Sequence, residues 1–384
     1  MTDFRQIPLD QMRAVVDRFE QRRQNAMATA TPVRDLVKRA IRRQTPARCP
    51  SRLYRLSYDV IVRHGDGLAD LFCEFPDDVA FIAPYYIFVG YQPPERKDRI
   101  DTLKVLMENA RWTDEWGTTW GHAFGGVGAT PVDHPIKDWS QLDDYLKKQF
   151  PDPHAPGRLN AAKAAADKFR GNRYVMGTVQ MALFERLHAL RGFENTFEDV
   201  YTCESEVRRL LEALTEFALG LLDEWAKIGP DGILFTDDWG TQQSLMISPK
   251  MWRALFQPCY RRMFDRAHRA GLDVIFHSCG NVTEIVGGLI EAGVDALDPL
   301  QPGAMDLAAI AKEFGGRVAF HGGIDDQHLL TQGTPGQIRD SVRWLIDTMG
   351  RPYGNGLILS PANSIPPETP LENLRALFEA CHQK

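Results

Sequence analysis

Short apolar runs alternate with longer amphipathic stretches from about residue 50 to the end of the chain. An apolar run of about five residues is typical of a strand buried on both faces, and the longer stretches carry apolar residues at helical spacing. This alternation predicts β/α units around a parallel sheet. The eight candidate strands are residues 52–57, 79–83, 174–178, 232–236, 273–277, 295–299, 317–322 and 356–360. Eight strands close a barrel, so the predicted fold class is an α/β, (β/α)8 TIM barrel.

Two further segments lie outside this pattern. Residues 8–43 have apolar positions at helical spacing, which predicts an N-terminal helical extension over residues 1–50, before a barrel over residues 51–384. A long insertion follows the second strand, at about residues 90–170, and contains the Trp-, Gly- and Thr-rich run RWTDEWGTTWGHAFGGVGATPVDHPIKDW. Long loops in compact domains are usually functional or disordered, and aromatic residues argue against disorder. We expect a hairpin or lid over the barrel mouth.

Composition excludes several classes of function. Of the 384 residues, 43% are apolar and 25% are charged, and no apolar run approaches the ~20 residues that span a bilayer. The charged N-terminal segment lacks the apolar stretch of a secretory signal, so a cytoplasmic location is expected. A net charge of −6 gives no reason to expect nucleic acid, and six scattered cysteines predict free thiols.

Polar and aromatic side chains follow nearly every expected strand. In a (β/α)8 barrel the active site forms at the carboxyl ends of the strands. Buried polar groups cost free energy unless they are paired or used, so this clustering predicts a functional mouth. The residues concerned are Tyr58, Tyr85, Tyr86, Gln180, Asp237, Asp238, Trp239, His277, Cys279, Gln301, His321 and Asn363.

His277 and Cys279 are the first candidates for metal binding, since imidazole nitrogen and thiolate sulfur are good zinc ligands. Their i, i+2 spacing on extended chain places both on one side of a strand. Zinc needs at least three protein ligands, so a packed histidine beside a packed thiol remains an alternative. The adjacent Asp237 and Asp238 cannot both face the pocket, and the sequence does not choose between them.

Three blocks carry a family resemblance: FHSCGNVTEIVGGLIEAGVDALDPLQP, VAFHGGIDDQHLLTQGTPGQIRDSV and GLILSPANSIPPETPLENLRALFEA. They resemble the uroporphyrinogen decarboxylase superfamily, which also contains cobalamin-dependent methyltransferases. The resemblance covers most of the chain from about residue 50 and implies a (β/α)8 barrel, commonly a homodimer. The haem-pathway decarboxylase fits less well, because its arginine-rich segment has no counterpart in SRLYRLSYDVIVRHG.

The methyltransferase branch implies zinc held by His277, Cys279 and a cysteine after the last strand, where this chain has Asn363. An amide oxygen is a poorer zinc partner than a thiolate, so a carboxylate of the aspartate pair is expected to replace it, and we assign Asp237 to the metal. The implied function is metal-assisted methyl transfer, with a corrinoid carried by a partner protein.

Two alternatives remain open. The first is a metal-free decarboxylase or lyase acting on a small cyclic or aromatic acid, in which Asp238 supplies a proton while His321 and Tyr86 hold the substrate. The second is a non-catalytic protein that binds a corrinoid or another small ligand. In each case we expect the small molecule to contact Tyr58, Tyr85, Gln180, Trp239, Gln301 and Asn363.

Overall fold

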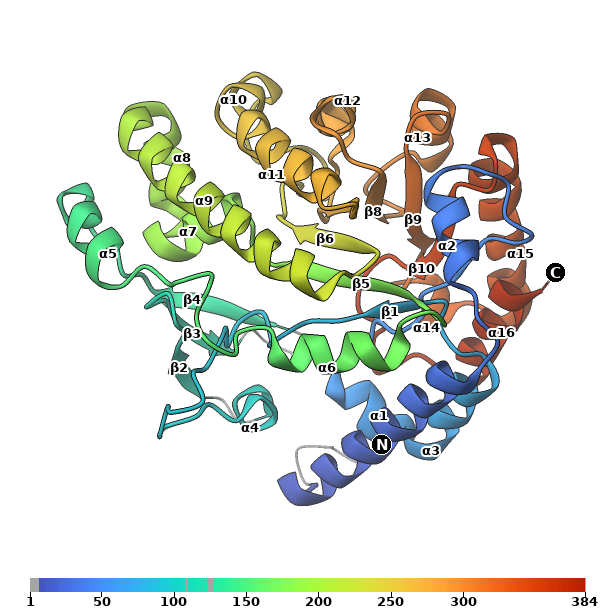
Figure 1. Ribbon diagram of the computed structural model, residues 1–384. Coiled ribbons are helices and arrows are strands. Elements are labelled where there is room, and N and C mark those ends of the chain that lie inside the picture. The colour runs from blue at the N-terminus through green and yellow to red at the C-terminus, as the bar shows by residue number, and fades with distance from the viewer. Residues whose placement is uncertain (1–6, 108–109, 123–127, 384) are drawn as a thin grey trace.

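A seven-stranded parallel sheet forms the centre of the computed structural model, which describes residues 7–107, 110–122 and 128–383 (Figure 1). The strands lie side by side in chain order, and the sheet curls with most of the helices on its outer face. They are β1 (Val79–Phe81), β5 (Tyr174–Val179), β6 (Gly232–Thr236), β7 (Asp273–His277), β8 (Ala296–Leu300), β9 (Ala319–Ile324) and β10 (Leu357–Pro361). The α/β class and seven of the eight expected strands are confirmed.

The first expected strand is not a regular strand in the structure. Ser51 makes one isolated parallel bridge, to Leu359 of β10. Beyond it, the backbone N–H groups of Leu53 and Tyr54 donate to the carboxylate of Asp77, at 2.6 and 3.1 Å. A side chain therefore takes the hydrogen bonds that a neighbouring strand would take, and the regular sheet has seven strands.

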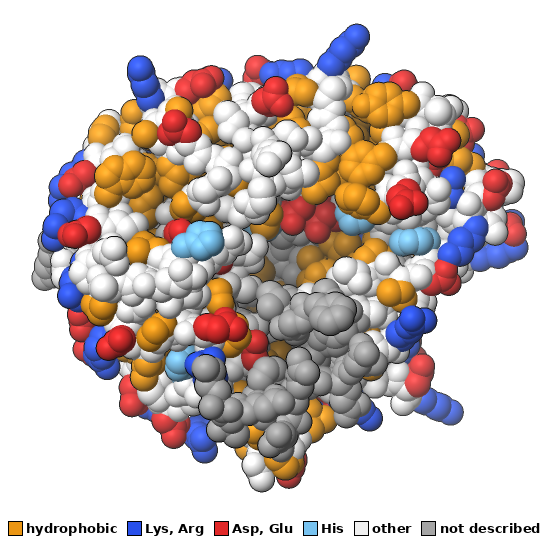
Figure 2. Space-filling model, turned by 180° about the vertical axis from the view of Figure 1, so that it is seen from behind, with side chains coloured by type: hydrophobic (Ala, Val, Ile, Leu, Met, Phe, Trp, Pro, Cys, Tyr) orange, Lys and Arg blue, Asp and Glu red, His pale blue; other side chains and the backbone are white. Residues whose placement is uncertain are grey.

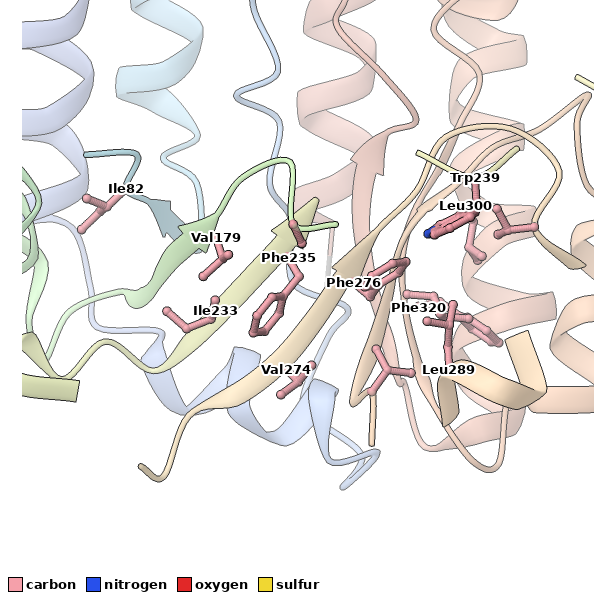
Figure 3. Packing of buried hydrophobic residues seen from close by; sticks show 14 of the residues in the cluster. Ile82, Val179, Ile233, Phe235, Trp239, Val274, Phe276, Leu289, Leu300 and Phe320 are labelled. Atoms are coloured by element: carbon pink, nitrogen blue, oxygen red, sulfur yellow. The ribbon is translucent and has the colours of Figure 1, made fainter. Parts of the chain in front are cut away.

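The helices that follow the strands are amphipathic and bury their apolar faces. The larger ones are α3 (Tyr58–Glu74), α6 (Asn160–Phe169), α7 (Phe184–Arg191), α8 (Phe193–Thr202), α9 (Glu204–Ile228), α10 (Pro249–Leu255), α11 (Gln257–Arg269), α12 (Thr283–Ala292), α13 (Leu307–Phe314), α15 (Pro335–Leu345) and α16 (Leu371–His382). Short helices are α14 (Leu329–Gln332), η2 (Trp139–Gln141), η3 (Ile346–Gly350) and η4 (Arg351–Tyr353). The helices cover the outer face of the sheet and pack against its buried side chains, such as Phe235, Phe276 and Phe320 (Figure 3).

The N-terminal segment forms two helices, α1 (Leu9–Thr29) and α2 (Arg34–Ile41), where the sequence predicts one. Pro32 lies between the two helices and accounts for the break. Proline has no N–H for a helical hydrogen bond, and it disfavours helical geometry in the residue before it. Helix α1 packs along α3 (Figure 1). Helix α2 packs against β5, β9 and β10 and closes one end of the curled sheet.

The concave face of the sheet changes from apolar to polar along the strands. An apolar cluster that includes Val37 and Ile41 of α2 contains Met176, Leu234, Ile275, Ala296, Ala319 and Ile358. Side chains two residues further along a strand lie on the same face. In the same strand order, these next residues are Thr178, Thr236, His277, Asp298, His321 and Ser360. The register confirms the row, since Thr236 pairs with His277 and His277 with Asp298.

The insertion contains a separate antiparallel sheet of β2 (Arg111–Thr113), β3 (Thr119–His122) and β4 (Ala129–Asp133), with α4 (Thr102–Met107) and α5 (Leu142–Lys148) on either side. Trp112 and Trp120 of this sheet share a buried cluster with Met181 and with Ala189 of α7. Residues 108–109 and 123–127 of the expected lid lie outside the described residues. The antiparallel strands β2 to β4 confirm that the insertion contains a hairpin, and its role as a lid stays a prediction.

All six cysteines are free thiols, as predicted. Within the described part of the chain, no helix combines the length and apolar character needed to cross a membrane.

Helix α2 should contribute strongly to stability, because it seals the apolar layer. We expect Ile41→Ala to lower the free energy of unfolding by about 2–5 kcal/mol, since Ile41 is only 2% exposed and its loss leaves a cavity. Urea denaturation measures the change. Tyr201→Ala, at a site 64% exposed, is the control and should change stability by less than about 0.5 kcal/mol. Equal effects of the two variants would contradict this role for α2.

Candidate functional site

The loops after β6 and β7 are held together backbone to backbone. The N–H of Gly240 donates to the carbonyl of Cys279 at 3.2 Å, and the N–H of Asn281 donates to the carbonyl of Thr241 at 2.7 Å. Gly280 has a φ of +80°, and a Cβ there would lie 2.4 Å from the carbonyl carbon of Gly240. Only glycine permits so close an approach, which fixes the two loops against each other.

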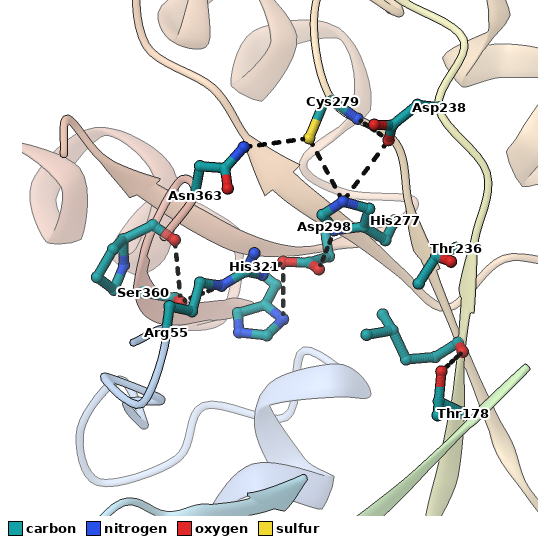
Figure 4. Close-up of polar contacts among 12 residues, drawn as sticks. Arg55, Thr178, Thr236, Asp238, His277, Cys279, Asp298, His321, Ser360 and Asn363 are labelled. Atoms are coloured by element: carbon teal, nitrogen blue, oxygen red, sulfur yellow. Dashed lines mark hydrogen bonds and ion pairs between the residues drawn. The ribbon is translucent and has the colours of Figure 1, made fainter. Parts of the chain in front are cut away.

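This contact brings Asp238, His277 and Cys279 together, and one ligand atom of each lies within 4.8 Å of the others (Figure 4). His277 Nε2 lies 3.4 Å from Cys279 Sγ and 3.6 Å from Asp238 Oδ1. The backbone N–H of Cys279 donates to Asp238 Oδ1 at 2.8 Å and holds that carboxylate in place. An oxygen, a nitrogen and a sulfur donor at this spacing fit a zinc ion.

Asp298 orients the imidazole ring of His277 through the ring nitrogen that faces away from Asp238 and Cys279. The separation between His277 Nδ1 and Asp298 Oδ2 is 2.8 Å, which requires the proton on Nδ1. Nε2, with its lone pair, then faces Asp238 and Cys279. A carboxylate behind a histidine in this way is a common support for a metal ligand.

Asp298 is the centre of a buried ionic cluster. Arg55 donates to its Oδ1, and His321 Nδ1 lies 3.3 Å from the same atom. Burial acts to raise the pKa of Asp298, but Arg55, His321 and His277 together hold this pKa well below its ordinary value. The group is therefore a carboxylate throughout the physiological range.

His321 is fully buried, and burial lowers its pKa to about 3. The imidazole is therefore neutral at pH 7. Despite its distance to Asp298, neither ring nitrogen has hydrogen-bond geometry with any described residue. The sequence expectation that His321 holds a substrate stays a prediction.

Cys279 is a thiol in this environment. Burial, followed by the negative charge of Asp238, raises the pKa of Cys279 well above its ordinary value. Asn363, which occupies the position expected for the third ligand, points its Nδ2 at Cys279 Sγ at 3.5 Å. A bound cation would reverse this preference and favour the thiolate.

Asp237 does not join the cluster, in contrast to its expected role as a metal ligand. Its carboxylate points into the protein and accepts the N–H groups of Leu183, Phe184 and Glu185, at 3.0, 2.9 and 2.7 Å. Neighbouring residues on extended chain face opposite ways, so Asp238 turns to the site while Asp237 caps the start of α7. Burial raises the pKa of Asp237 to about 6.

Glu185, in the first turn of α7, is a site residue that the sequence analysis missed. Burial raises its pKa well above the ordinary value, and the nearby Asp238 and Asp237 add to the shift. The shift favours the protonated form of this carboxyl group, which lies close to Asp238. An acidic residue in the first turn of a helix is common for reasons of helix polarity alone, so the sequence contained no signal for this role.

Trp239 and Gln301, both expected to contact substrate, instead support the loops. Trp239 is fully buried, stacks on Phe184 at 4.3 Å and donates its indole N–H to the hydroxyl of Tyr260 at 2.8 Å. Gln301 is also buried, and its Oε1 accepts the N–H of Gly280 at 2.8 Å. The contacts of both side chains are therefore made within the protein.

The remaining expected residues lie around the insertion and α3. Tyr85 and Gln180 line a cavity beside Trp116 and Arg186. Tyr86 packs edge-on against Phe88, and burial raises its pKa to about 12. Tyr58 is half-buried at the start of α3. The substrate contacts assigned to these tyrosines and to Gln180 stay predictions.

Seen from behind, the molecule is hollowed near its centre, with acidic and histidine side chains at the edge of the hollow (Figure 2). A solved structure with the same fold is a methyltransferase from Methanosarcina mazei, which aligns with a TM-score of 0.66 at 15% identity over 92% of this chain and 98% of that one. The curled sheet thus belongs to the class of TIM-barrel-like α/β proteins.

Residues 124–384 match the family of uroporphyrinogen decarboxylase (URO-D), and the chain belongs to this family. It is 27% identical to uroporphyrinogen decarboxylase of Legionella pneumophila over 194 residues, 50% of this chain and 52% of that protein. It is 21% identical to the methylcobamide:CoM methyltransferase MtbA of Methanosarcina acetivorans over 248 residues, 65% of this chain and 69% of the relative. The match thus spans about half the length of the first relative.

The buried neutral state of His321 predicts a dependence of stability on pH. A histidine titrates near pH 6.5 in an unfolded chain, so between pH 6.5 and about 3 the unfolded state binds a proton that the folded state does not. Stability should fall as the pH falls through this window. We expect His321→Gln to reduce the loss between pH 7 and pH 4 by roughly 3 kcal/mol, measured by urea denaturation.

The control for this measurement is Gln327→Ala, which removes an exposed side chain that does not titrate and should leave the pH dependence as in the wild type. A His321→Gln protein that loses as much stability as the wild type would contradict the assignment of a neutral, buried His321.

Proposed function

We propose that this chain is a metal-dependent methyltransferase that passes a methyl group from a corrinoid to a thiol, with zinc held by Asp238, His277 and Cys279. The observation that supports it best is the convergence of three different ligand atoms within 4.8 Å at the carboxyl ends of two neighbouring strands. The name of MtbA, methylcobamide:CoM methyltransferase, adds support for a corrinoid as the methyl donor.

A zinc ion bound there would lower the pKa of a thiol that joins it, and would supply a strong nucleophile at neutral pH. The protein's own groups prepare the site. Asp298 orients His277, and the N–H of Cys279 fixes Asp238. Asn363 directs a donor at the sulfur of Cys279, which stabilises its thiolate form. Glu185 lies close to Asp238, and its raised pKa favours the protonated form.

The proposed ligand set departs from that implied by the family resemblance. A carboxylate on the β6 loop takes the role of the expected cysteine, and Asn363 occupies the place of that cysteine as a hydrogen-bond donor. Carboxylate oxygen is an accepted zinc ligand in combination with histidine, so the substitution keeps two negative charges in the set.

The corrinoid would come with a partner protein, as the resemblance to the methyltransferase branch implies. We further propose that the curled sheet works as a (β/α)8 barrel, with residues 51–53 in the eighth position and the β2–β4 sheet as its lid. The homodimer and the cytoplasmic location stay predictions.

A metal-free decarboxylase is the second candidate, and the position of Glu185 close to Asp238 favours it, because the raised pKa of Glu185 favours the protonated form. Such a site could deliver a proton to a substrate carbon after loss of carbon dioxide. Ligand binding without turnover would instead indicate a non-catalytic protein. A measurement of bound metal distinguishes the proposed methyltransferase from the metal-free decarboxylase and from the non-catalytic protein.

Elemental analysis of protein purified without chelator tests the metal site. We expect about one zinc per chain in the wild type, and loss of most of it in Asp238→Asn, His277→Ala and Cys279→Ser, because each change removes one of three protein ligands. Cys73→Ser, at an exposed thiol, is the control and should retain the metal. Demethylation of methylcobalamin by added thiol should follow the zinc content. Wild-type protein without metal would overturn the proposal.

Asn363→Cys tests the geometry of the third position. Asn363 already lies within reach of Cys279 Sγ, so a thiolate there should join the same ion and raise zinc affinity by about tenfold or more. The change should also restore zinc binding when combined with Asp238→Asn. Titration against a chromogenic chelator measures both. A double variant that stays free of metal would show that residue 363 does not face the ion.

A further inference from the structure

We propose that a cavity at the amino ends of the strands binds a small organic phosphate, with the phosphate group among three arginines and an apolar organic part on the cavity floor. The cavity has a volume of about 280 Å³. Pockets for small molecules measure roughly 300–1,000 Å³, so this volume fits a compact ligand. The site lies at the opposite end of the sheet from the metal ligands and goes beyond the proposed function.

The position of the cavity follows from the segments that lead into the last strand and its neighbour. Arg351 and Asn355 line the cavity and come shortly before β10. Cys49 also lines it and comes two residues before Ser51, whose parallel bridge to Leu359 aligns that segment with β10. These residues precede their strands, whereas the metal ligands follow theirs. Helices α15 and α16 lie together on this side of the sheet, near the C-terminus (Figure 1).

Small, uncharged side chains form the floor of the cavity. Cys49, Ala380 and Cys381 line it and are buried, and their short side chains leave room for a ligand. Burial raises the pKa of Cys49 to about 12, so this thiol is neutral at pH 7. A buried neutral cysteine behaves as a small apolar group. The floor can therefore accept an apolar part of a ligand.

Helix α15 supplies two of the arginines. Arg339, Val342 and Arg343 line the cavity at spacings of three and four residues, which places them on one side of the helix. Val342 is buried and continues the apolar floor, whereas the side chains of Arg339 and Arg343 are exposed. Arg351 of η4 is also exposed. A cationic rim thus borders an apolar floor.

The cationic side chains of the cavity have no carboxylate among them. Arg48, Arg339, Arg343 and Arg351 line it, and no Asp or Glu of the described chain does. Arg48 makes two hydrogen bonds of 2.7 Å to the carboxylate of Asp78, which balances its charge. The other three arginines create a positive potential at the cavity, because a concave surface with charges of one sign concentrates their field.

These three arginines keep hydrogen-bond donors for a ligand. Arg343 donates through Nη1 to Asp340 at 3.2 Å, and Arg351 donates through Nη1 to the carboxylate one turn earlier. Nη1 of Arg339 lies 4.0 Å from Glu379, beyond hydrogen-bond distance. Among the residues that the structure describes, Nε and Nη2 of all three have no protein acceptor. Exposed ion pairs of this kind are weak enough for a ligand to replace.

A phosphate monoester matches this arrangement. It carries close to two negative charges at neutral pH and three terminal oxygens that accept hydrogen bonds. The guanidinium group fits such oxygens, and here the donors approach from two elements, α15 and η4. A carboxylate has one charge and two oxygens, so it would leave part of the cationic rim without a partner. The ligand class is therefore a phosphate monoester with a small apolar body.

Isothermal titration calorimetry at constant ionic strength tests the site, with phenyl phosphate as the probe. We expect saturable binding to the wild type. Arg339→Gln and Arg351→Gln should each weaken it by about tenfold, because each removes charge-assisted hydrogen bonds. Absence of saturable binding to the wild type, or unchanged affinity in both variants, would overturn the site.

Arg253→Gln is the matched control. The side chain of Arg253 is 45% exposed, against 41% for Arg339, and it pairs with Glu291 at 2.8 Å, but it does not line the cavity. This variant should bind phenyl phosphate as the wild type does. An equal loss of affinity in Arg253→Gln would indicate a general effect of protein charge and would overturn the site.

Inorganic phosphate tests the organic part of the ligand. It should displace phenyl phosphate but bind about tenfold more weakly, because it cannot remove the apolar floor from water. Equal affinities for the two probes would overturn the assignment to an organic phosphate.

Tungstate gives a test that needs no variant, since it is a tetrahedral oxyanion with strong anomalous scattering. In crystals of the wild type soaked in tungstate, anomalous density should appear within hydrogen-bond distance of Arg339 and Arg351. Density elsewhere only would reject the site, even if the variants fail to fold.

Discussion

The carboxylate of Asp298 is the constraint on which the functional end of this molecule depends. It lies on the concave face of the sheet, binds Arg55 from the segment before α3 and His277 from β7, and lies 3.3 Å from Nδ1 of His321 in β9. A buried carboxylate needs such partners, because charge without compensation is unstable away from water. One residue thereby ties the N-terminal segment to the last third of the chain and sets the orientation of a candidate metal ligand.

A second constraint is the backbone contact between Gly240 and Gly280. It holds the β6 and β7 loops so closely that Asp238 reaches Cys279, while Asp237 is left to cap α7. Two adjacent carboxylates thus have different tasks. One keeps a helix in place, and the other remains available for a ligand. Trp239 and Gln301 also stabilise these loops, since Trp239 donates to Tyr260 and Gln301 accepts the N–H of Gly280.

The interior of the sheet separates stability from chemistry. The apolar layer sealed by α2 removes hydrophobic area from water, which is the main stabilising contribution in such a fold. The polar layer two residues further along contains the buried carboxylate of Asp298, which is paired with Arg55 and His277.

The sequence by itself determined the alternation of strands and helices, because apolar runs and helical spacing are local patterns that burial imposes on each element. It also determined that His277 and Cys279 share one side, since the two-residue period of a strand needs no tertiary information. Family resemblance extended this to the class of fold. The tertiary structure alone decided which of Asp237 and Asp238 faces the site, that Trp239 is a core residue, and that Asp77 replaces a strand ladder with side-chain hydrogen bonds. It also placed Glu185 beside Asp238. These outcomes depend on contacts between residues far apart in the chain, where period and composition carry no information about which partner will be near.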